Sequence, residues 1–243
     1  LVRQEELLDL EFFLGQLKYL KVESALRGDV EKTRAVDLAL FQQLRALELQ
    51  SVKPHLVGGL PALSQQLQLV VVRNSVNALE ELLDVELSDA WAQLTELDCA
   101  RNNVPSLHPC TAQLVALEKL DLSHNLLTRL DQPLHCPCLT FLDLSFNHLS
   151  SLEHVNEYIG GVRTLLLRAN KLASTRGLDK LYSLERLDLS DNVISSMLEV
   201  TRLAALPALS HLWLFGNPIS LAKDYRIDAI ASLGDRLVLD GLA

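Results

Sequence analysis

The stretch Leu117-Glu-Lys-Leu120-Asp-Leu122-Ser-His-Asn125-Leu-Leu127 decides the fold, because its pattern recurs along the chain. Each copy has the form Leu-x-x-Leu-x-Leu-x-x-Asn-x-Leu, with Val, Ile or Cys in some of the Leu positions. The asparagines of the successive copies are Asn102, Asn125, Asn147, Asn170, Asn192 and Asn217, at steps of 23, 22, 23, 22 and 25 residues. Self-similarity at so regular a step indicates a solenoid, in which one structural unit is stacked many times.

The Leu-x-Leu core of each copy alternates apolar and intervening residues. This alternation predicts a short strand with one set of side chains inside and the other outside. The Asn follows the strand, where its amide can satisfy backbone groups of its own turn and of the neighbouring turn. The pattern therefore predicts a leucine-rich-repeat solenoid. This is an α/β fold with a parallel sheet on the concave face, short helical or 3-10 segments on the convex face and a ladder of buried asparagines.

The same register divides the chain into three regions. Residues 1–16 are expected to form an N-terminal helical cap or linker, 17–221 the repeats, and 222–243 a C-terminal cap. The repeats are degenerate over 17–93, where Val52 and Ser75 replace the Asn, and regular over 94–221. A helix is expected at 78–83. Helical periodicity at 223–233 and a last strand at 236–240 predict a polar terminator that covers the open end of the core.

Composition narrows the classes of function. The net charge is −9, from 31 acidic residues against 22 Lys and Arg, which argues against binding to nucleic acid or an anionic membrane surface. The chain has no apolar run near the ~20 residues of a membrane helix, and its start has no signal-peptide pattern. Because it lacks an initiator Met, we expect a fragment of a longer protein. The four cysteines lie within the repeats, which favours a cytosolic location.

Several stretches carry a family resemblance. Residues 181–194 and the Tyr225-Arg226 terminator resemble the short, SDS-type cytosolic class of leucine-rich repeats. Within that class, Leu17-Lys-Tyr-Leu-Lys-Val22, residues 139–153 and Asn217-Pro-Ile-Ser220 are similar to the nischarin family. That resemblance implies endosome association, Rac and Rab-type small GTPases and p21-activated kinases as partners, and restraint of cell migration. It also implies a phosphoinositide-binding PX domain and an integrin-binding region outside this sequence.

The outward positions of the strands predict a partner-binding surface on the concave face. The candidate residues are Trp213, Phe215, His211, Phe141, Asp143, Leu166, Arg168, Arg186 and Asp188, with Phe146 just beyond them at the strand exit. Exposed aromatic side chains that gather in a patch favour an interface. Alternatively, the terminal helix covers Trp213 and Phe215, and their solvent exposure distinguishes the two interpretations.

A column of aspartates, namely Asp98, Asp121, Asp143 and Asp188, is expected beside these residues. Adjacent strands lie ~4.8 Å apart, so the carboxylates could repel one another, bind a cation or meet a basic partner. The interpretation favoured by the sequence is that they are solvated and neutral toward partners, because surface charges usually contribute little.

Metal and catalytic sites are not expected. Cys136-Pro137-Cys138, with His135 and Cys110, lacks the paired spacing of a zinc site, so these thiols are predicted to lie in loops and core. The Ser-x-Asn element recurs in several repeats and is therefore scaffold rather than a nucleophile with its base. The sequence thus predicts a protein-interaction scaffold with no catalytic residue and no cofactor. A regulatory subunit of a protein phosphatase, as in the short repeat class, is the alternative.

Overall fold

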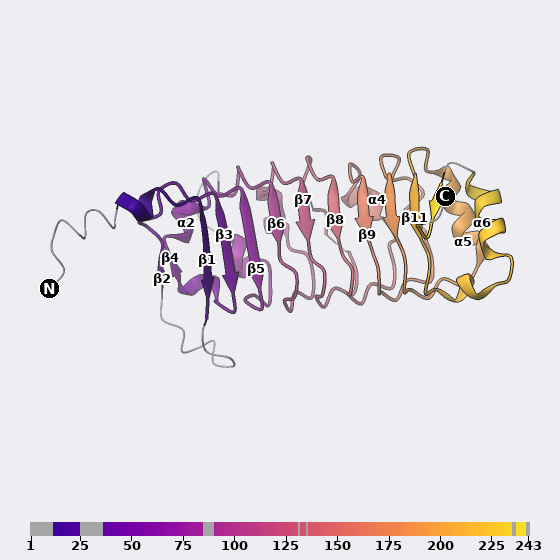
Figure 1. Cartoon of the computed structure of the whole chain (residues 1–243), viewed down its shortest axis with the longest axis horizontal. Coiled ribbons are helices and arrows are strands. Elements are labelled where there is room, and N and C mark those ends of the chain that lie inside the picture. The colour runs from indigo at the N-terminus through magenta and orange to yellow at the C-terminus, as the bar shows by residue number, and fades with distance from the viewer. Residues whose placement is uncertain are drawn as a thin grey trace.

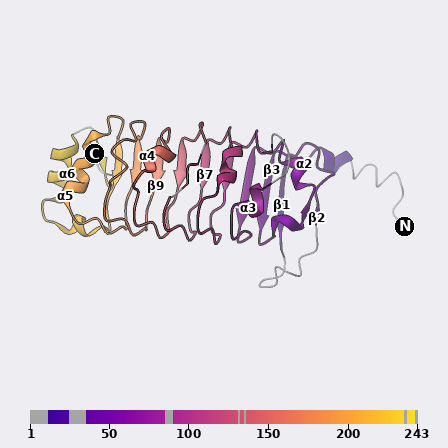
Figure 2. The ribbon, with the colours of Figure 1, turned by 180° about the vertical axis from the view of Figure 1, so that it is seen from behind.

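The computed structural model describes residues 12–24, 36–84, 90–130, 132–134, 136–234 and 237–241. They form an elongated solenoid with a long parallel sheet along one side (Figure 1). The sheet has the strand order β1-β3-β5-β6-β7-β8-β9-β10-β11-β12, so that each strand pairs with the strand of the next repeat. Seen from behind, short helices and connecting segments cover the other side of the sheet (Figure 2). This arrangement confirms the predicted fold.

The strands are longer at the N-terminal end than in the regular repeats. Strands β1 (Tyr19–Glu23), β3 (Ala46–Gln50) and β5 (Leu69–Arg73) have five residues each. The later ones are β6 (Glu96–Asp98), β7 (Lys119–Asp121), β8 (Phe141–Asp143), β9 (Thr164–Leu166), β10 (Arg186–Asp188), β11 (His211–Trp213) and β12 (Val238–Leu239). A separate small sheet pairs β2 (Val36–Asp37) with β4 (Val57–Gly58), which the sequence did not indicate because two-residue strands carry no alternation.

Short helices connect the strands. The α-helices are α2 (Leu60–Leu63), α3 (Glu80–Leu83), α4 (Val155–Tyr158), α5 (Met197–Arg202) and α6 (Tyr225–Leu233), and the 3-10 helices are η2 (Pro54–Leu56), η3 (Pro109–Gln113), η4 (Leu203–Ala205) and η5 (Pro218–Leu221). Helix α3 lies in the segment where a helix was expected. Residues 12–15 are helical, whereas 1–11 of the expected N-terminal cap lie outside the described residues. None of the helices in the described ranges is long and apolar enough to span a bilayer.

The core is a stack of leucines from consecutive strands. The central residues of β6 to β11 pair in register, and each is at most 2% exposed: Leu97, Leu120, Leu142, Leu165, Leu187 and Leu212. Cys99 occupies a Leu position and is fully buried, as predicted. Each repeat therefore contributes apolar surface that only its neighbours can cover, and burial of this surface provides the main stabilisation of the stack.

The predicted asparagine ladder is present beside this core. Asn147 accepts a hydrogen bond from the N–H of Leu127 (3.0 Å) and donates to the carbonyl oxygens of Leu122 and Leu144 (3.0 Å each). The same bonds to the preceding repeat recur at Asn102, Asn125, Asn170, Asn192 and Asn217. In the degenerate part, the hydroxyl of Ser75 accepts from the N–H of Val52 and so replaces the missing amide.

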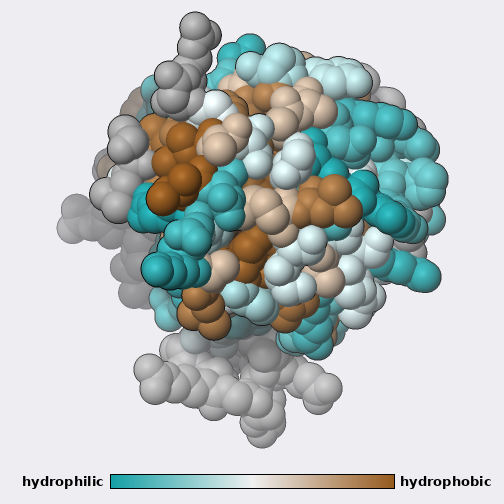
Figure 3. Space-filling view, turned by 90° about the vertical axis from the view of Figure 1, so that its right-hand side faces the viewer, coloured by the Kyte–Doolittle hydropathy of each residue, from teal (hydrophilic) through white to brown (hydrophobic). Residues whose placement is uncertain are grey.

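Asp240 closes the C-terminal end of the sheet at the position that aligns with Trp213 of β11. Its Oδ1 accepts from the N–H groups of Leu214 (2.7 Å) and Phe215 (3.1 Å), and its Oδ2 accepts from the hydroxyl of Tyr225 (3.1 Å). The end of the molecule is nevertheless less polar than expected of a terminator. Leu221 is 87% exposed, and Figure 3 shows hydrophobic patches separated by hydrophilic side chains on this end.

Candidate functional site

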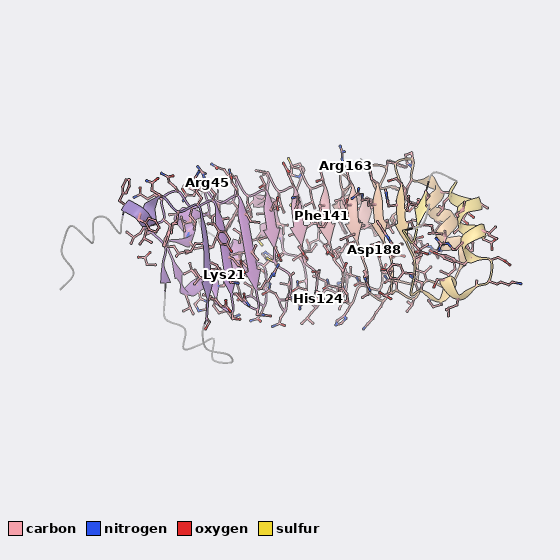
Figure 4. The ribbon with its side chains drawn as sticks, viewed as in Figure 1. Lys21, Arg45, His124, Phe141, Arg163 and Asp188 are labelled. Atoms are coloured by element: carbon pink, nitrogen blue, oxygen red, sulfur yellow. The ribbon has the colours of Figure 1, made fainter. Side chains whose placement is uncertain are left out.

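The outer surface of the sheet, which we call the sheet face, carries two rows of side chains. One row is Glu96, Lys119, Phe141, Thr164, Arg186 and His211, and the other is Asp98, Asp121, Asp143, Leu166, Asp188 and Trp213. Parallel pairing in register places neighbours of each row on adjacent strands, roughly 4.8 Å apart. Figure 4 shows Phe141 and Asp188 between the two long edges of the sheet.

The ten predicted site residues fall on two surfaces rather than one. Seven belong to the sheet face: Phe141, Asp143, Leu166, Arg186, Asp188, His211 and Trp213. The other three, Phe146, Arg168 and Phe215, follow the ends of β8, β9 and β11. They belong to what we call the strand-exit edge, the row of residues between each strand and its ladder asparagine.

The third outward position differs from expectation in four repeats. Alternation predicts that Ala100, Ser123, Ser145 and Ser190 also face outward, but each is at most 7% exposed, whereas Arg168 and Phe215 at the same position are exposed. The chain turns immediately after the strand, because the N–H of each of the four buried residues donates to the aspartate two positions earlier at 2.8–2.9 Å. The turn carries their side chains inward, and the sheet face is two residues wide in these repeats.

Apolar side chains interrupt the charged sheet face at three places. Phe141 lies between Lys119 and Thr164, and Leu166 lies between Asp143 and Asp188. Trp213, on β11, stacks on His211 with ring centroids 5.9 Å apart.

The terminal helix leaves the aromatic residues near it accessible. Helix α6 packs against α5 and η5. Phe215 remains 37% exposed and Trp213 is partly exposed, so the helix does not cover either ring completely.

The aspartate column has a structural role. Asp98, Asp121, Asp143 and Asp188 each use Oδ1 to accept the backbone N–H two residues later, and Asp98 also pairs with Arg73. Burial, together with the charges of Asp121 and Asp188, raises the pKa of Asp143 above its ordinary value, although Ser145 donates to it. One oxygen of each carboxylate is therefore committed to the turn, which supports the partner-neutral interpretation for that oxygen.

The strand-exit edge carries a continuous run of ring contacts. His124 stacks on Phe146 with centroids 4.2 Å apart and planes within 5°. The guanidinium of Arg168 lies 5.9 Å from the ring centroid of Phe146 and 5.4 Å from that of Phe215, and its Nε donates to Asp191 at 2.9 Å. Phe146 is 43% exposed and has a left-handed backbone (φ 56°), which is uncommon for a bulky residue. The left-handed backbone recurs at Arg101, His124, Ala169 and Asp191 and therefore belongs to the repeat, whereas the exposed ring of Phe146 favours a binding surface.

One group of possible metal ligands was missed in the sequence. Atoms of Glu80, His108 and Cys110 lie within 4.8 Å of one another, because Glu80 comes from the preceding repeat. The Nδ1 of His108 accepts the N–H of Cys110, so in the neutral ring the proton is on Nε2, which faces Glu80 at 3.6 Å. This geometry is that of a His–carboxylate pair. Burial raises the pKa of Cys110 and of Cys136 to about 12, and His135 lies outside the described residues.

Comparisons with known proteins agree with this architecture. A family model described as leucine rich repeat matches residues 92–149. An internalin from Listeria monocytogenes has a similar structure, with a TM-score of 0.61 and 17% identity over 94% of this chain and 61% of that chain. At this identity the likeness shows the fold alone.

Among the similar sequences are serine/threonine-protein kinase 11-interacting proteins. The human protein is 31% identical over 95% of this chain and 22% of its own length, and the mouse protein is 38% identical over 81% and 19%. An uncharacterised leucine-rich repeat-containing protein of Schizosaccharomyces pombe is 32% identical over 63% of this chain and 25% of its own length. The chain thus spans about a fifth to a quarter of the length of these relatives.

These relatives correct the resemblance to nischarin, which rested on repeat residues that many leucine-rich repeats share. The expectations of Rac and Rab-type GTPases, endosomes and cell migration came from that resemblance and gain no support from the relatives. The chain is a leucine-rich-repeat solenoid that is similar, over nearly its whole length, to one part of the serine/threonine-protein kinase 11-interacting proteins.

Proposed function

We propose that this chain is a protein-interaction scaffold that binds a protein kinase, or an assembly containing one, through the sheet face. The observation that carries the proposal is the placement of Phe141, Leu166 and Trp213 on the sheet face among charged side chains. Buried aromatic anchors surrounded by polar groups are typical of interface centres. Extended faces of repeat solenoids commonly serve this purpose.

The choice of a kinase rests on the relatives. The human, chicken and mouse proteins are named for interaction with serine/threonine-protein kinase 11. The charge pattern of the sheet face suits a partner with mixed charge, since Lys119 and Arg186 lie in one row and Asp121, Asp143 and Asp188 lie in the row beside it. Complementary charges of this kind would set the orientation and the association rate more than the affinity.

The proposal is tested by measuring the affinity of the purified chain for purified serine/threonine-protein kinase 11 by biolayer interferometry. Phe141→Glu is expected to weaken binding at least about 30-fold, because a central aromatic anchor contributes about 2 kcal/mol or more. Tyr182→Glu is the matched control: Tyr182 is 61% exposed and lies outside the strands, so this variant should bind like the original chain.

Both variants must retain the original melting temperature. Absence of kinase binding by the original chain, or equal binding by Phe141→Glu, would contradict the proposal. A protein phosphatase catalytic subunit measured in parallel tests the alternative predicted from the short repeat class, and selective binding of that subunit would replace the kinase as partner.

A further inference from the structure

A polar pocket opens on the strand-exit edge, apart from the sheet face. It has a volume of about 350 Å³ and is lined by Lys53, Asn74, Ser75, Val76, Asn77, Arg101, Asn102, Asn103 and His124. Asn74, Arg101 and His124 have left-handed backbones (φ 51°, 57° and 55°) at the exits of β5, β6 and β7. Three consecutive repeats therefore contribute equivalent positions to one wall, at the ~4.8 Å spacing of adjacent strands.

The charge of the pocket is opposite to that of the molecule. The chain has a net charge of −9, yet the lining residues include Lys53 and Arg101 and no carboxylate. Arg101 is exposed and forms no ion pair within the described part of the chain. Lys53 is held by Glu81 at 3.2 Å, which orients the ammonium group and uses one of its three donors.

Most backbone N–H groups of the pocket lining are already bonded within the solenoid. The N–H groups of Ser75 and Val76 donate to Asn102, and that of Asn77 donates to Glu81. A ligand would therefore be held mainly by side chains. The guanidinium of Arg101, the ammonium of Lys53 and the imidazole of His124 line one space, which suits an anion with several oxygens.

The pocket continues into an aromatic surface. His124 forms part of the pocket wall and stacks on Phe146, whose ring is 43% exposed. An anion bound beside His124 would thus lie next to an apolar platform. This pairing fits an extended peptide better than a membrane headgroup, because an anionic bilayer would repel a molecule of net charge −9.

We propose that the strand-exit edge binds a phosphorylated peptide, with its phosphate in the pocket formed by Lys53, Arg101 and His124 and a neighbouring apolar side chain on Phe146. A phosphate carries nearly two negative charges and three acceptor oxygens, which the converging donors match. This site is independent of the sheet face and of the kinase proposed to bind there.

The first experiment screens the purified chain against an array of serine peptides, each present in phosphorylated and unphosphorylated form, with an aromatic residue at varied distances from the serine. Phosphorylated members are expected to be selected. The best peptide is then titrated by fluorescence anisotropy. Arg101→Gln should weaken its binding about tenfold or more, as expected for loss of a charge-assisted hydrogen bond.

Arg163→Gln is the matched control, because it removes the same charge from the opposite long edge of the sheet (Figure 4). It should leave the affinity unchanged. Lys53→Gln should repeat the effect of Arg101→Gln, which guards against a folding defect in either variant, and Phe146→Ala should weaken the peptides that carry an aromatic residue. Phe141→Glu should bind the peptide normally even if it loses the kinase.

Three outcomes would overturn the proposal. The array could show no preference for phosphorylated members, or folded Arg101→Gln and Lys53→Gln could both bind like the original chain. Vesicles of phosphatidylcholine with 5% phosphoinositide could also capture the chain through Arg101 while the peptides fail to bind, which would assign the pocket to a lipid headgroup instead.

Discussion

Single asparagines close the turns of the solenoid, and their bonds are internal to it. Asn147 satisfies the N–H of Leu127 and the carbonyl of Leu122, both from the preceding repeat. We expect Asn147→Ala to lower the free energy of unfolding by about 2–4 kcal/mol, because unpaired buried polar groups cost about 1–3 kcal/mol each. Urea denaturation measures this change.

Asn103→Ala is the control for Asn147→Ala. Asn103 is exposed, and its amide bonds to the side chain of Asn77. Its removal should change stability by no more than about 0.5 kcal/mol, as for most surface substitutions. Equal effects of the two substitutions would mean that the ladder does not stabilise the stack.

The raised pKa of Asp143 predicts a specific pH dependence. A carboxyl group whose pKa is higher in the folded than in the unfolded chain stabilises the folded state as long as the pH lies below the unfolded-state pKa. This contribution to the free energy of unfolding is lost as the pH rises through the folded-state pKa. Asp143→Asn keeps an oxygen for the N–H of Ser145 and cannot ionise. The variant should therefore gain stability relative to the original chain as the pH rises from about 3 to 7.

Urea denaturation of Asp143→Asn and of the original chain over this pH range measures the effect. If the free energy of unfolding of Asp143→Asn falls relative to that of the original chain as the pH rises, the folded protein favours the carboxylate and the prediction is wrong.

At the scale of elements, the C-terminal cap depends on one side chain that joins β11, α6 and the last turn. Asp240→Ala removes the acceptor for Leu214 and Phe215 and leaves Ala at φ 54°. We expect a loss of about 1–3 kcal/mol and faster amide exchange at Leu214, because that N–H becomes unpaired. Hydrogen exchange followed by mass spectrometry detects the local loosening.

Asp240→Asn separates the hydrogen bond from the charge. Asn supplies the same acceptor and tolerates the left-handed backbone, so its stability should be close to that of the original chain. If Asp240→Asn loosens Leu214 as much as Asp240→Ala does, the charge of Asp240 rather than its hydrogen bonds to Leu214 and Phe215 holds the cap.

The strands that recur from repeat to repeat could be predicted from the sequence, because their pattern is repeated. Leucine alternation and the step between asparagines located the strands of the regular repeats and the ladder. Leu239 pairs with Leu212, so Asp240 aligns with Trp213 and not with Asn217, and the asparagine step did not indicate its role. The β2–β4 sheet and the 3-10 helices carry too few residues for a period to show.

For the whole molecule, the sequence determined the architecture better than the function. Periodicity specifies which side chains face outward, and it placed Phe141, Leu166 and Trp213 on the sheet. It placed Phe146 at the strand exit, but it did not show that the chain turns immediately after the strand and buries Ser123. The pocket beside Arg101 was missed because its lining comes from residues up to 71 positions apart, from Lys53 to His124.

The left-handed residue before each ladder asparagine gives the molecule an unusual freedom. Its backbone is fixed by neighbours, while its identity varies from Arg101 to His124, Phe146, Ala169 and Asp191. These repeats thus display side chains of different chemistry at one equivalent backbone position. Exchanging two of these side chains would change what the edge binds and leave the stack beneath it intact.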